Sequence, residues 1–104
     1  MRYRNTWVGA LLLAMALPPA AQASAQLASD KGCYNCHGAH RRGDAPSIER
    51  LSSRLSRLKG DEAALQKFVE QYRRGELLNH IDTHQHLSQA SAQALIRWLA
   101  EGAK

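Results

Sequence analysis

Apolar residues recur at helical spacing in three stretches of the second half of the chain. Polar and charged residues fill the positions between them, which is the pattern of helices that each bury one face against a core. Trp98 stands beside the last apolar stripe. The three stripes are Ile48, Leu51, Leu55 and Leu58; Leu65, Phe68, Val69 and Tyr72; and Ala92, Leu95, Ile96 and Leu99.

The residues that flank these stretches indicate where the helices begin and end. Asp61 and Ser88 are natural N-caps, because their side chains can accept a hydrogen bond from the first helical turn. Lys59-Gly60 ends the first helix and Gly102 the last. Gly75 follows two arginines, where a left-handed C-terminal residue after a basic last turn is expected.

The remaining segments complete an all-α prediction. Leu27 to Gly32 is a short N-terminal helix, and residues 37–46, rich in Gly, His and Arg, form a loop. Residues 76–87 lose the helical pattern and form a second, histidine-rich loop. Because no alternating pattern and no internal repeat occurs, we expect about four short helices and no strand.

The first 25 residues have the organisation of a secretory signal peptide. Arg2 and Arg4 form a positive start, Trp7 to Leu17 an apolar core, and Pro18-Pro19 a helix break. The alternative is an uncleaved membrane anchor. The apolar run of about eleven residues is too short for that, since roughly 20 are needed to span a bilayer.

Two small-residue cleavage sites are available, after Ala23 or after Ala25. Removal of residues 1–25 leaves residues 26–104 as one small domain with 12 Lys and Arg against 9 Asp and Glu. This modest positive charge, without interleaved aromatic residues, does not indicate a nucleic-acid partner. We expect a periplasmic protein that is not stably inserted in a membrane.

The stretch Cys33-Tyr34-Asn35-Cys36-His37 carries the most specific chemistry. Two cysteines three apart and an adjoining histidine are typical of c-type haem attachment. The thiols, one helical turn apart, would bond the two haem vinyl groups, and His37 would be the proximal iron ligand. Gly32 and Gly38 would leave room for the flat macrocycle.

Other uses of Cys33 and Cys36 were weighed. Half of a zinc site, a thioredoxin-like redox pair and a simple disulfide all use the same spacing. Zinc would need two histidines as further ligands, and a thioredoxin-like motif would follow a strand. A covalent haem also supplies the apolar bulk that so small a chain lacks, so we expect the haem-free protein to fold poorly.

The order of these features resembles class I cytochrome c, in particular its small bacterial mono-haem members. An N-terminal helix leads into the haem motif, a proline-containing loop and two middle helices follow, and a ligand loop precedes a Trp-bearing helix. The resemblance implies that the carbonyl of Pro46 accepts a hydrogen bond from His37, which fixes its ring. It also implies that Leu95 and Trp98 lie on a C-terminal helix that crosses the N-terminal one.

The chain departs from that family at the distal ligand. The family places a methionine in the loop before the last helix, but Met1 and Met15 are the only methionines here. The loop offers His80, His84 and His86 instead. His80 is our first choice, since it is nearest to the family's ligand position, with His84 and His86 as alternatives. A vacant or weakly held sixth position, with Asn79 or water, and a purely solvated loop are the other outcomes.

The resemblance implies a carrier of single electrons, or the cytochrome subunit of an exported redox enzyme, and not an enzyme in itself. Its partners would be redox proteins, and histidine in place of methionine predicts a lower reduction potential. The alternative is a protein that binds or senses carbon monoxide or nitric oxide. Peroxidase activity and zinc binding are further alternatives. Five basic residues are candidates for contact with haem propionates or with a docking partner. The alternative is that they lie in a solvated surface. They are His40, Arg41, Arg42, Arg54 and Arg57.

Overall fold

The computed structural model describes residues 19–76 and 81–104, and every regular element in this part of the chain is helical. The helices are α1 (Pro19–Asp30), α2 (Cys33–His37), α3 (Ile48–Leu55), the 3-10 turn η1 (Ser56–Leu58), α4 (Glu62–Arg74), α5 (Asp82–Gln85) and α6 (Gln89–Ala100). The described residues include no strand, so the all-α prediction is confirmed at this level.

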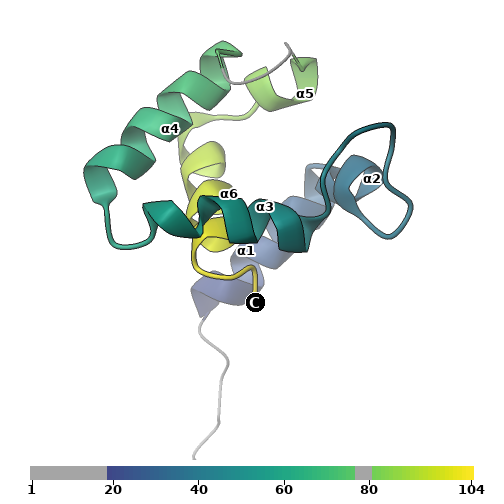
Figure 1. Cartoon of the computed structure of the whole chain (residues 1–104), viewed down its shortest axis with the longest axis horizontal. Helices are drawn as coiled ribbons and strands as arrows, with labels where there is room; N and C mark the ends of the chain where they lie inside the picture. Colours follow the sequence, from purple (N-terminus) through teal and green to yellow (C-terminus); the bar gives the residue numbers. More distant parts are fainter. Residues whose placement is uncertain (1–18, 77–80) are drawn as a thin grey trace, which may run out of the picture.

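Helix α6 is the centre of the packing. It contacts α4, α3 and α1, and Figure 1 shows it passing through the middle of the molecule. The hydrophobic core gathers on it, because five of its twelve residues are buried. The buried apolar residues are Ala28, Leu55, Leu58, Leu65, Val69, Leu87, Ala92, Leu95, Ile96, Trp98 and Ala100. The indole N–H of Trp98 is buried without a hydrogen-bond partner among the described residues.

The predicted caps of α4 and α6 are confirmed. The Asp61 side chain accepts a hydrogen bond from the Ala64 N–H at 3.0 Å, and Ser88 Oγ accepts one from the Ser91 N–H at 3.0 Å. Gly75 ends α4 in the left-handed conformation, with φ +72°. These caps satisfy backbone groups that a helix terminus otherwise leaves without a partner.

Four sequence predictions differ from the structure. We expected about four helices, but the described residues form six α-helices and one 3-10 turn. The N-terminal helix begins at Pro19 instead of Leu27, because the alanine-rich stretch before Leu27 favours helix, and it ends at Asp30. Both predicted cleavage points therefore lie within α1. The helix that we expected to continue to Leu58 changes to 3-10 geometry after Leu55, and the histidine-rich loop contains the one-turn helix α5.

Polar contacts join α3 and α4 to α6. Ser52 on α3 donates its hydroxyl to the Leu99 carbonyl of α6 at 2.7 Å. Arg97 on α6 makes a two-pronged ion pair with Glu62 on α4, one hydrogen bond of which measures 2.9 Å. Arg73 near the end of α4 donates to the Leu87 carbonyl at 3.1 Å. These bonds set the position of the α4–α6 connection, which carries α5.

Candidate haem-attachment site

Helix α2 begins directly after a glycine turn. Gly32 has φ +74°, a left-handed conformation that lets the chain reverse between α1 and α2. Gly38 ends α2, and its N–H donates to the Tyr34 carbonyl at 3.0 Å. A Cβ at Gly38 would overlap that carbonyl oxygen. Both glycines therefore shape the short helix. This role is additional to the one expected from the sequence, which was to leave room for the haem.

His37 is half-buried at the end of α2 and has a fixed orientation. Its Nδ1 lies 2.6 Å from the carbonyl oxygen of Pro46, nine residues further along the chain. Since a carbonyl oxygen only accepts, Nδ1 carries the proton and Nε2 keeps its lone pair. Nε2 is therefore available to a metal, and the hydrogen bond makes it a stronger donor. This contact is the one that the cytochrome c resemblance implies.

Cys33 and Cys36 are both free thiols, so the described chain contains no disulfide between them. Cys33 is partly buried against the core, while Cys36 is exposed. Burial raises the pKa of the Cys33 thiol, and the neighbouring Cys36 adds to this. Reactive cysteines of thioredoxin-like pairs have a lowered pKa instead. Cys33 also follows helix α1, whereas a thioredoxin-like pair would follow a strand, so the redox-pair alternative is not favoured.

Four aromatic side chains form a row that leads from α4 to α2, and we call it the ring row: Phe68, Tyr72, His84 and His37. The ring centres of Phe68 and Tyr72 are 6.5 Å apart, and those of Tyr72 and His84 are 4.6 Å apart with 23° between the planes. The His84 and His37 centres are 6.4 Å apart, with planes within 18° of parallel. The ring row brings two imidazoles from distant parts of the sequence to one place.

The ring row is only partly shielded from water, since all four of its side chains are half-buried. Burial lowers the pKa of His84, and the nearby His37 lowers it further, because both disfavour an imidazolium. Burial also raises the pKa of Tyr72. Both side chains are therefore neutral near pH 7, and a neutral imidazole is the form that binds metals.

The structure places the other candidate ligands differently. His86 is exposed at the C-terminal end of α5, and His40 is exposed in the 37–46 loop. His80, our first choice for the distal ligand, and Asn79 lie outside the described residues. Within residues 19–76 and 81–104, no three His, Cys, Asp or Glu side chains are grouped to hold one metal ion.

Two large apolar side chains are exposed on the segments that carry the histidines. Tyr34 on α2 is 40% exposed, and Ile81, directly before α5, is 43% exposed. Single exposed apolar side chains are common on protein surfaces, so these two only add apolar area near the histidines. Two thiols on one helical turn, an oriented imidazole and apolar neighbours are the chemistry that a covalently attached haem requires.

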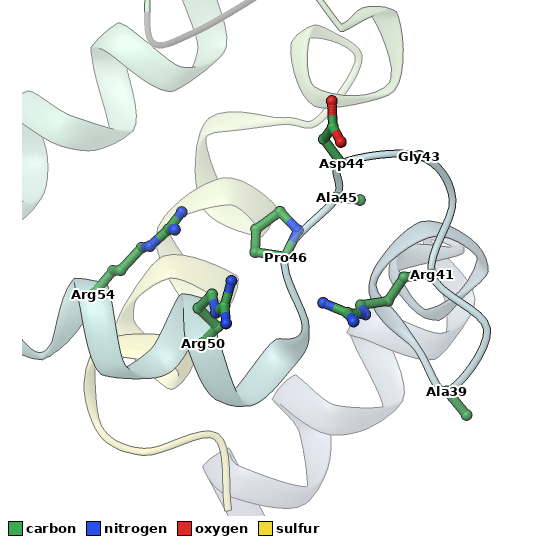
Figure 2. A pocket seen from close by; sticks show the side chains of 8 residues that line it. All are labelled: Ala39, Arg41, Gly43, Asp44, Ala45, Pro46, Arg50 and Arg54. Atoms are coloured by element: carbon green, nitrogen blue, oxygen red, sulfur yellow. The ribbon is translucent and has the colours of Figure 1, made fainter.

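A polar surface hollow of about 420 Å³ lies beside the Pro46 loop, as Figure 2 shows. Arg50 and Arg54 approach it from α3, and Arg41 approaches it from the loop. No hydrogen bond or ion pair joins these three guanidinium groups to another described residue. Arg57, another predicted docking residue, lies over the Phe68 ring at 5.7 Å instead. His40 and Arg42 are exposed in the loop.

No described helix is both long and apolar enough to cross a bilayer. Comparisons with protein-family models, with curated proteins and with solved structures found no match for this chain. The sequence pattern and the geometry of the site therefore carry the functional argument.

Sequence reasoning missed the place of Tyr72. Its position in the apolar stripe of residues 65–72 predicted a core side chain, and the periodicity gave no sign that its ring would stack on a histidine. The only available signal was the position of Tyr72 near the helix end, where the chain turns toward the histidine-rich segment. α5, which carries His84, was missed because a four-residue helix is too short for periodicity to detect.

Proposed function

We propose that the protein is an exported mono-haem c-type cytochrome with the class I arrangement, and that it carries single electrons. The observation that carries this proposal is the His37–Pro46 hydrogen bond of 2.6 Å directly after the Cys33–Cys36 pair. It orients one imidazole next to two thiols on a single helical turn, which is the requirement for attachment and proximal ligation.

In this proposal each residue has a structural task. Cys33 and Cys36 attach the haem by thioether bonds, and His37 ligates the iron through Nε2. Pro46 holds the His37 ring, while Phe68 and Tyr72 provide apolar cover. The haem supplies one-electron chemistry between the ferric and ferrous states. No side chain needs to act as an acid, a base or a nucleophile.

Two further elements of the proposal come from the sequence, and a third comes from the structure. Residues 1–25 direct export to the periplasm and are removed, and redox proteins are the partners. The three unpaired arginines at the hollow, Arg41, Arg50 and Arg54, provide positive charge for an acidic docking surface. Since docking charges act over several ångströms, the arginines would raise the rate of association more than the affinity.

The experiment that tests the proposed function is a redox titration of the exported protein, followed by its absorption spectrum. We expect one reversible one-electron transition and a reduced spectrum that carbon monoxide does not change. The Cys33→Ser, Cys36→Ser double variant, exported in the same way, controls for adventitious haem. A rapid spectral shift with carbon monoxide would favour ligand binding or sensing, and it would contradict the electron-carrier function.

A further inference from the structure

The position of His84 relative to His37 has a chemical meaning beyond the attachment of a haem. His37 lies on α2 and His84 on α5, and the two imidazole centres are 6.4 Å apart. The centres of Tyr72 and His84 are closer, at 4.6 Å. The two imidazoles are therefore near each other without being as tightly packed as the Tyr72–His84 pair.

This separation suits two ligands on opposite sides of one metal ion. Imidazole binds iron as well as zinc, and its nitrogen lies about 2.0–2.1 Å from a bound metal. The centre of the ring is roughly 1.1 Å further away, so two opposed imidazoles have centres roughly 6.3 Å apart. The observed distance between the ring centres, 6.4 Å, matches that value. The two rings are stacked with 18° between their planes, so ligation would also require a nitrogen of each ring to face the ion.

Tyr72 positions His84. The phenol ring stacks on the imidazole with 23° between the planes, and Phe68 supports Tyr72 from the same helix at 6.5 Å. α5 also contacts α4 directly. Contacts with α4 therefore restrict the His84 imidazole before it binds a metal. Less conformational entropy would then be lost when His84 becomes a ligand.

We propose that His84 is the distal iron ligand, opposite His37, and that Tyr72 is the residue that positions it. This inference rests on the proposed function, because it needs a haem attached at Cys33 and Cys36. It assigns the ligand to a histidine different from our first choice on sequence, His80, and it makes the iron bis-histidine ligated.

His86 is the natural control for His84. It lies two residues away and is exposed, and it makes no ring contact among the described residues. His84 lies on α5 and His86 caps its C-terminal end, so their replacement perturbs neighbouring backbone, but only His84 belongs to the ring row. His80→Ala provides the comparison with the competing assignment.

The test uses the full exported protein and three measurements. Haem-dependent staining of a denaturing gel reports covalent attachment. Electron paramagnetic resonance of the oxidised protein reports spin state, and stopped-flow mixing of the reduced protein with carbon monoxide reports an open iron position. The variants are His84→Ala, His86→Ala, His80→Ala and His84→Met.

We expect each variant to stain for haem. His84→Ala converts most of the haem from low spin to high spin, and it binds carbon monoxide at least tenfold faster than the parent. His86→Ala and His80→Ala keep the parent spectrum. His84→Met restores a low-spin haem with the spectrum of methionine ligation and a higher reduction potential.

Tyr72 has its own test. Tyr72→Phe keeps the stacked ring and is expected to keep the low-spin spectrum. Tyr72→Leu loses the ring, and we expect part of the haem to become high spin while staining stays unchanged. Equal spectra for the two Tyr72 variants would overturn the positioning role.

The inference and the proposed function fail in different ways. A parent protein without covalent haem contradicts the proposed function. Staining protein whose His84→Ala variant remains low spin and insensitive to carbon monoxide contradicts the inference alone. If His84→Ala does not accumulate, His84→Met decides, since an unchanged bis-histidine spectrum in that variant also overturns it.

Discussion

Ser52 joins two helices through a single buried hydroxyl. It is the buried polar side chain of the described core, and its Oγ donates to the Leu99 carbonyl of α6 at 2.7 Å. A hydroxyl removed from water needs such a partner, because leaving it unpaired is unfavourable. On the sequence alone Ser52 belongs to the polar face of its helix, and periodicity does not distinguish it from Ser53. The Leu99 carbonyl that accepts this bond lies 47 residues further along the chain. The contact can therefore be identified only from the three-dimensional structure.

We predict that Ser52→Ala destabilises the exported protein by about 1 kcal/mol, the usual net value of one hydrogen bond. The Leu99 carbonyl still accepts from the Gly102 N–H at 3.1 Å, so the loss stays near that value. Urea unfolding followed by circular dichroism measures it. Ser53→Ala, an exposed change on the same helix, serves as the control, and an equal effect of both substitutions would refute the role of Ser52.

The helices of this chain are ended mainly by local interactions, and local interactions are what sequence can predict. Asp61, Ser88 and Gly75 were assigned as caps from residue type and position, and the structure confirms all three. α5 and the Tyr72–His84 stack were not predictable in the same way. They arise because Arg73 fixes the segment before α6 and folds residues 81–87 back against α4.

For the cap of α4, we predict that Asp61→Ala costs about 1 kcal/mol of unfolding free energy, within a usual range of about 0.5–2 kcal/mol. The substitution leaves the Ala64 N–H without its side-chain acceptor. Asp61→Ser retains an acceptor oxygen and is expected to recover most of the loss. Thermal unfolding of the three proteins compares them, and a Ser variant as unstable as the Ala variant would argue against capping.

The ion pair between α4 and α6 predicts that the stability of the folded protein depends on pH. Hydrogen bonds from Arg97, and secondarily from Gln66, lower the pKa of Glu62 in the folded protein. A carboxyl group whose pKa is lower when folded stabilises the protein above its unfolded pKa, about 4.3 for Glu, and this contribution disappears as the pH falls through the folded value. Glu62→Gln therefore lowers the unfolding midpoint at neutral pH, and the difference from the parent shrinks below about pH 4.

Denaturant midpoints of the parent and of Glu62→Gln between neutral and acidic pH measure this dependence. Glu49→Gln is the matched control, because Glu49 is exposed and makes no side-chain contact in the described chain. A pH-independent difference for Glu62→Gln would show that the ion pair is not its cause.

At the scale of the whole molecule, the apolar core is small relative to the number of described residues that pack around it. The described core has eleven buried apolar residues, five of them on α6 itself, and α2 and α5 have no buried residue. The two segments that carry His37 and His84 are therefore less supported by the core than α4 and α6 are. A covalent haem between them would add the apolar contact that they lack.

We accordingly predict that the haem-free protein is only partly ordered. The Cys33→Ser, Cys36→Ser variant should show lower helicity and a broader, less cooperative thermal transition than the parent. Amide hydrogen exchange should show the largest loss of protection in α2 and α5, with α6 least affected. Equal protection of α2 and α5 in both proteins would contradict a structural role for the haem.

The most direct test of the account is the intact mass of the exported protein under denaturing conditions. We predict a chain that begins at Ser24 or Gln26 and retains the mass of one haem, whereas the double cysteine variant retains none. A denatured parent chain without that added mass would contradict the assignment of Cys33, Cys36 and His37 as a haem-attachment site, and with it the electron-transfer function.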